Sequence, residues 1–69
     1  MKTHTHFEVE VSFTDSTSFV VESEYSTNAA ILAISYLDQP ETVSVSIEEI
    51  ETEEGEMFGK CVSRQIILK

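Results

Sequence analysis

The amino-acid sequence predicts an α+β domain in which a four-stranded antiparallel sheet, with strand order 2-1-3-4, carries one helix on one face. Two observations predict this fold class. Three segments alternate apolar and polar residues as half-buried strands do, a fourth does so less regularly, and one central segment has apolar residues at helical spacing. The chain has 69 residues and is 41% hydrophobic, which suffices for one core, so we expect residues 1–69 to form a single domain.

The first two strands are expected to form a hairpin. In residues 6–13, phenylalanine and valine occupy every odd position and polar residues occupy the even ones. A turn cluster follows at residues 15–18, and residues 19–25 form the second strand. Because the apolar faces must match, odd residues pair with odd residues. We therefore expect Phe13 opposite Phe19, around a loop of about three to five residues.

One helix is expected at residues 28–38. Ser26 or Thr27 is a suitable N-cap, and the only proline of the chain ends the segment. The residues expected to pack on the sheet are Ala30, Ala33, Ile34 and Leu37. Leu32 and Tyr36 then fall on a neighbouring apolar stripe. Either edge loops and the C-terminal residues cover this stripe, or it is the contact of a homodimer or a partner protein.

The last two strands are expected at residues 42–47 and 57–68, with a turn at residues 53–56. The alternation breaks at residues 48–50, which indicates a bulge or the end of the strand. A right-handed crossover through the helix gives the strand order stated above. The facing and register of the final strand stay open, because its two basic residues share a face with apolar ones in the alternating pattern.

Acidic residues outnumber basic ones by thirteen to four, which gives a net charge of −9. In the expected register, Glu10 lies opposite Glu22, and Glu8 opposite Glu24, on the face that lacks the helix. Like charges directly opposite each other destabilise a sheet, so their presence suggests a binding surface. A solvated face whose charge serves only solubility is the alternative. The candidate partner-binding residues are Glu8, Glu10, Glu22, Glu24, Glu48, Glu49, Glu51, Glu53, Glu54 and Glu56.

The acidity also indicates the class of partner. It disfavours direct binding to nucleic acids or anionic membranes and favours a basic surface on another protein. The sequence shows no signal-peptide pattern, and its longest apolar run, residues 29–34, is far too short to cross a bilayer. We therefore expect a cytoplasmic protein.

Metal binding and catalysis have little support in the sequence. His4 and His6 point the same way on an extended chain, but a structural zinc site needs four ligands, and Cys61 and a glutamate would have to complete it. No glycine-rich phosphate loop or EF-hand pattern is present. We expect no metal, no cofactor and no enzymatic activity, and hence no catalytic residues.

A short, acidic, cysteine-poor ββαββ chain resembles the small accessory proteins of bacteriophages. Some anti-CRISPR proteins are compact sheet-plus-helix modules that block nucleic-acid channels, several of them with acidic surfaces. A phage inhibitor of host RNA polymerase has a similar build, with a strand–Ser/Thr–helix passage like residues 18–21 followed by residues 26–33. The likeness covers residues 7–47. It implies a non-enzymatic inhibitor of a host protein that acts in the host cytoplasm, and it assigns no individual functional residue.

Overall fold

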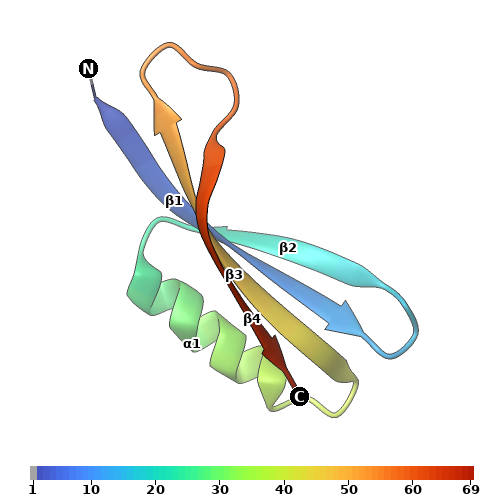
Figure 1. Ribbon diagram of the computed structural model, residues 1–69. Coiled ribbons are helices and arrows are strands. Elements are labelled where there is room, and N and C mark those ends of the chain that lie inside the picture. Colours follow the sequence, from blue (N-terminus) through green and yellow to red (C-terminus); the bar gives the residue numbers. More distant parts are fainter. Residues whose placement is uncertain (1) are drawn as a thin grey trace.

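The computed structural model describes residues 2–69 and has the predicted architecture (Figure 1). Its elements, in order, are β1 (Thr3–Phe13), β2 (Ser18–Ser23), α1 (Ser26–Leu37), β3 (Thr42–Glu53) and β4 (Lys60–Leu68). The strands form one antiparallel sheet in the order β2-β1-β3-β4. The predicted fold class, strand order and helix placement are therefore confirmed.

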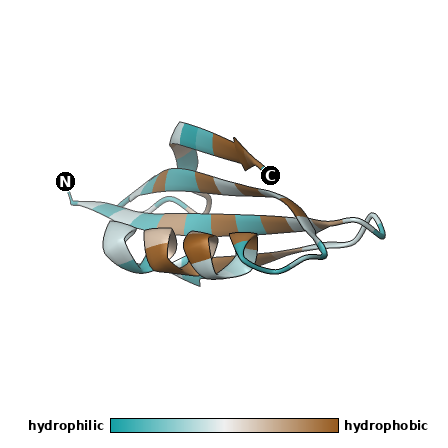
Figure 2. Cartoon of the chain, turned by 90° about the horizontal axis from the view of Figure 1, so that it is seen from below, coloured by the Kyte–Doolittle hydropathy of each residue, from teal (hydrophilic) through white to brown (hydrophobic). Residues whose placement is uncertain are grey.

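The core lies where α1 packs against one face of the sheet, as the edge-on view shows (Figure 2). Its fully buried members are Val9, Val11 and Val45 from the sheet, with Ala29 and Ala33 from the helix. The opposite face of the sheet has no helix, and we call it the open face. Within residues 2–69, no helix combines the length and the apolar character needed to cross a membrane.

The helix is rotated relative to the sequence-based expectation. Ala29 and Ala33 face the sheet, because their small side chains let the helix backbone approach it closely. Leu32 and Tyr36, expected on a neighbouring stripe that either other segments of the chain cover or a partner contacts, pack around this contact and are partly buried. Ile34, expected to face the sheet, is 68% exposed.

The boundaries of the helix also differ slightly from the expected ones. It begins at Ser26, with Tyr25 in the N-cap position and no side-chain capping hydrogen bond, so neither Ser26 nor Thr27 acts as the cap. Side-chain packing therefore stabilises α1 more than its termini do, as is usual for a helix this short. Tyr36 contributes to that packing through an edge-on contact with Phe19, with ring centroids 5.0 Å apart.

Part of the sheet extends beyond the helix as a twisted projection, which we call the arm (Figure 1). It consists of residues 2–5, 51–53 and 60–61 together with the loop 54–59. The radius of gyration is 13.0 Å, whereas a compact chain of this length has a radius of about 11 Å. The arm accounts for this elongation, and residues on it lie away from the main core.

The register of the first hairpin differs from the expected one by two residues, although its parity is correct. Val11, not Phe13, lies opposite Phe19. The loop is shorter than a Phe13–Phe19 pair would give. The Phe13 amide donates a hydrogen bond to the Thr17 carbonyl (2.9 Å), and Ser16 adopts a left-handed φ of 72°. The Asp15 carboxylate accepts hydrogen bonds from the side chain and the amide of Thr17, which lower the pKa of Asp15 below its ordinary value.

Replacing Ser16 with glycine is expected to raise the free energy of unfolding by about 0.5–1 kcal/mol. A left-handed backbone strains serine and leaves glycine unstrained. Urea denaturation followed by circular dichroism measures the change. Ser18→Gly is the control, because Ser18 lies in β2 and does not have a positive φ. That variant is expected to be less stable than the parent. A Ser16→Gly protein that is also less stable would contradict the loop geometry.

A bulge in the last hairpin determines which face of the sheet each residue of the final strand occupies. β3 continues to Glu53, and the pairing shifts between Glu49, opposite Ser63, and Ile50, opposite Cys61. Val62 is the extra residue on β4, so the predicted irregularity is a bulge and not a strand end. Arg64, Ile66 and Leu68 consequently lie on the open face. Lys60 does not share that face with them, because the bulge changes the parity.

Candidate functional site

Three glutamates from three adjacent strands form a row across the open face. Glu8 of β1 lies directly opposite Glu22 of β2 on one side and Glu48 of β3 on the other. We call Glu22, Glu8 and Glu48 the carboxylate row. Arg64 of β4 continues it, because it pairs with Glu48 in the sheet and its Nη2 lies 2.9 Å from Glu48 Oε1.

The carboxylate row keeps an uncompensated negative charge. The single guanidinium of Arg64 reaches Glu48 at one end, while Glu8 in the centre has a like charge on each side. Opposed like charges on a sheet cost roughly 0.2–1 kcal/mol per pair. The row therefore opposes folding, which distinguishes it from charge that is merely dispersed over a surface.

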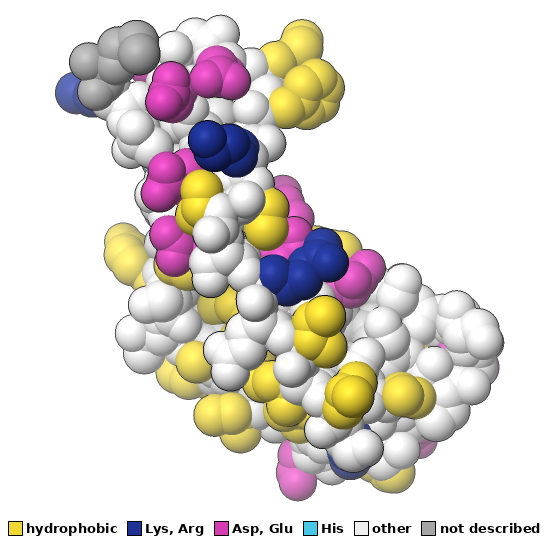
Figure 3. All heavy atoms as spheres, viewed as in Figure 1, with side chains coloured by type: hydrophobic (Ala, Val, Ile, Leu, Met, Phe, Trp, Pro, Cys, Tyr) yellow, Lys and Arg dark blue, Asp and Glu magenta, His cyan; other side chains and the backbone are white. Residues whose placement is uncertain are grey.

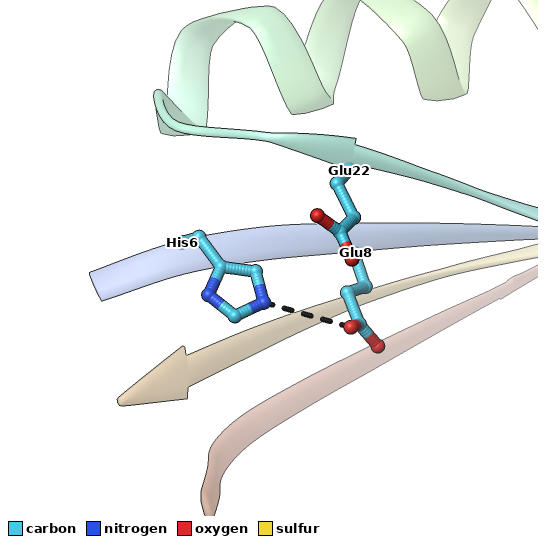
Figure 4. Close-up of side chains that lie close together, drawn as sticks. All are labelled: His6, Glu8 and Glu22. Atoms are coloured by element: carbon cyan, nitrogen blue, oxygen red, sulfur yellow. Dashed lines mark ion pairs between the residues drawn. The ribbon is translucent and has the colours of Figure 1, made fainter. Parts of the chain in front are cut away.

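An imidazole lies beside the row. His6 precedes Glu8 by two residues on the same face of β1, and its Nε2 lies 3.5 Å from Glu8 Oε2 (Figure 4). One ligand atom from each of His6, Glu8 and Glu22 falls within 4.8 Å of the others. The His4 and His6 rings are stacked, with centroids 6.3 Å apart. Cys61, which the sequence would have required for a zinc site, lies outside this cluster.

The other two glutamates expected on the open face flank the row. Glu10 lies between Val20 and Ser46 and is exposed. Glu24 follows the end of β2 and borders a shallow hollow together with His4, His6 and Glu22. The expected pairs Glu10–Glu22 and Glu8–Glu24 are thus wrong, because the hairpin register differs by two residues. The four residues still lie on or beside the open face.

The glutamate-rich segment after Glu48 does not extend the open face. Glu49, Glu51 and Glu53 pair with Phe7, Thr5 and Thr3, respectively, and so point to the face that carries the helix. Glu54 and Glu56 lie in the loop at the end of the arm. The ten candidate glutamates therefore occupy both faces and the arm tip, and only part of them can contact one flat partner surface.

The end of the arm carries two hydrophobic side chains that sequence reasoning missed. Met57 and Phe58 are 87% and 81% exposed. Hydrophobic atoms protrude there beside acidic ones (Figure 3). The sequence pattern had assigned both residues to the last strand, where one of them would be buried. Their position between Gly55 and Gly59 was the available sign of a longer loop.

No protein-family model matches the chain, and no curated protein or solved structure shows significant similarity to it.

Proposed function

We propose that this chain is a non-enzymatic protein-binding inhibitor, of the phage anti-CRISPR kind. Its open face would occupy a basic surface of a host protein that handles nucleic acid. The observation that supports this most directly is the carboxylate row, in which Glu8 lies between Glu22 and Glu48, while Arg64 is the one guanidinium beside the row among residues 2–69. A partner that supplies cations would relieve the repulsion on binding.

The chemistry of such a partner follows from the row. Lysine and arginine side chains arranged to bind phosphates also form charge-assisted hydrogen bonds with carboxylates. The row presents these carboxylates from hydrogen-bonded strands, so little backbone ordering is needed on association. Complementary charge would make association fast and sensitive to salt.

Met57 and Phe58 support a protein partner over a nucleic acid. Methionine and phenylalanine are enriched in the buried centres of protein interfaces. At the arm tip they project beside Glu54 and Glu56, which fits an apolar contact with an acidic rim. We assign the open face to steering and recognition, and the arm tip to a separate apolar contact that slows dissociation.

The test compares two variants that lose equal charge. In the first, Glu8, Glu10, Glu22 and Glu24 are all changed to glutamine; in the second, Glu41, Glu49, Glu51 and Glu53 are changed to glutamine, because these four lie outside both the open face and the arm tip. The first is expected to weaken partner binding by about 2 kcal/mol, roughly thirtyfold. It should keep or raise the melting temperature, because it removes like-charge contacts. The second should bind nearly as the parent does.

The measurement has two steps. Immobilised parent chain is used to capture partners from a bacterial lysate at low and at high salt, and mass spectrometry identifies them as a CRISPR effector, RNA polymerase or another protein. Affinities of the parent and both variants for the purified partner are then measured by calorimetry. Equal weakening by the two variants would assign binding to net charge alone and would refute the role of the open face.

A further inference from the structure

We propose that His6, Glu8 and Glu22 form a binding site for one divalent transition-metal ion of the zinc type. Their ligand atoms lie within 4.8 Å of one another, and the separation of His6 Nε2 and Glu8 Oε2 is 3.5 Å (Figure 4). Bonds of about 2.1 Å in a tetrahedral arrangement place neighbouring ligand atoms about 3.4 Å apart. The observed pair is already at this spacing.

The three side chains are held by regular structure. His6 and Glu8 occupy alternate positions of one strand and so share a face, and Glu22 is the residue directly opposite Glu8 on the next strand. The side chains of His6 and Glu8 are only 21% and 34% exposed, so their groups are partly shielded from water. A site built on paired strands, with its ligands close together before binding, needs little rearrangement.

Electrostatics favours a cation at this position. Glu8 has Glu22 and Glu48 on its two sides, and the only guanidinium of the row contacts Glu48. At the other end of the row, the basic group nearest to Glu8 and Glu22 is the His6 imidazole. A dication there would balance both carboxylates, and the imidazole would supply a nitrogen ligand.

The donor set indicates the class of metal. One imidazole nitrogen with two carboxylates suits zinc and its transition-metal neighbours, whereas calcium and magnesium require oxygen ligands throughout. Three protein ligands leave one tetrahedral position for a water molecule. His4 and Glu24 border the same hollow as His6 and Glu22. Metal binding at this site is a property of the isolated chain and is independent of the proposed inhibitory function.

Isothermal titration of the full chain with zinc sulfate tests the proposal. We expect saturable binding of one ion per chain. His6→Ala, Glu8→Gln and Glu22→Gln should each weaken it at least tenfold. Glu49→Gln is the matched control, since it removes the same charge from the neighbouring strand on the opposite face of the sheet. It should bind zinc as the parent does. Magnesium chloride at the same concentrations should give no comparable binding.

Thermal melting supplies a second measurement that does not depend on binding heats. Zinc should raise the melting temperature of the parent and of Glu49→Gln, and should raise the melting temperatures of the three ligand variants much less. Absence of saturable binding to the parent would overturn the proposal. Equal weakening in Glu49→Gln would do so too, because it would indicate diffuse attraction to an acidic surface. Loss of binding in His4→Ala but not in His6→Ala would assign the ion to His4 in place of His6 and would overturn the proposed set of ligands.

Discussion

Replacing Ala33 with leucine is expected to lower the free energy of unfolding by about 3 kcal/mol. Ala33 is 1% exposed and lies between α1 and the sheet, within the cluster that contains Val9, Val11 and Val45. A leucine there has no space, so the helix must move away from the sheet or the side chain must adopt a strained rotamer. A domain of 69 residues has a total stability of roughly 3–10 kcal/mol. The substitution should therefore remove about a third or more of that stability.

The control tests the rotation of the helix. Ala30 is exposed on the same helix, so Ala30→Leu is expected to change the free energy of unfolding by less than about 0.5 kcal/mol. The two variants add the same atoms and hardly differ in helix propensity. Urea denaturation followed by circular dichroism compares them. If Ala30→Leu were the destabilised variant, the face that packs on the sheet would be the one expected from the sequence pattern.

Replacing Gly59 with alanine is expected to lower the free energy of unfolding by about 2 kcal/mol. We expect the structural change to be confined mainly to the arm. A Cβ atom at this position would lie 2.4 Å from Ile50 Cγ2, 2.6 Å from Thr52 Oγ1 and 3.3 Å from the Glu51 carbonyl oxygen. Gly59 thus lies directly against β3 at the base of the loop 54–59. The added methyl would push the loop away and expose Ile50, which is otherwise buried.

A double-mutant cycle with Ile50→Ala shows whether this contact is the cause. Removing the Ile50 side chain makes room for the new methyl group, so the double variant should be more stable than the sum of the two single effects by at least about 0.5 kcal/mol. Denaturant titration of the four proteins gives this coupling. Strict additivity would show that Gly59 matters for another reason, such as backbone conformation.

The sequence pattern predicted the fold class, the strand order and the pairing parity, because these depend on strong two-residue periodicity and on the handedness of the crossover. It did not predict the hairpin register, since loops that differ by two residues preserve parity. In the structure, the left-handed backbone at Ser16 accompanies the shorter of these loops. The rotation of α1 was missed because residues 29–34 are all apolar. Close approach through Ala29 and Ala33 then determines the packed face.

The candidate site was predicted in part. Alternation placed Glu8, Glu10 and Glu22 on the open face, and the structure has them there. The carboxylate row and the proximity of His6 to Glu22 depend on the exact register across three strands. A pattern within single segments does not contain this information. The bulge at Val62, which brings Arg64 opposite Glu48, likewise appears only when the strands are paired.

The arm affects which residues of this chain can change during evolution. Helix α1 contacts β1, β2 and β3, whereas the loop at the arm tip is remote from the buried valines and alanines. Distant positions without shared partners affect stability nearly independently. Apart from Gly59, a lineage carrying this fold can therefore exchange tip residues such as Met57 and Phe58 with little penalty to folding. Under the proposed function, changes in the surface of the partner protein can be matched by substitutions at the tip, while the residues beneath the helix stay constant.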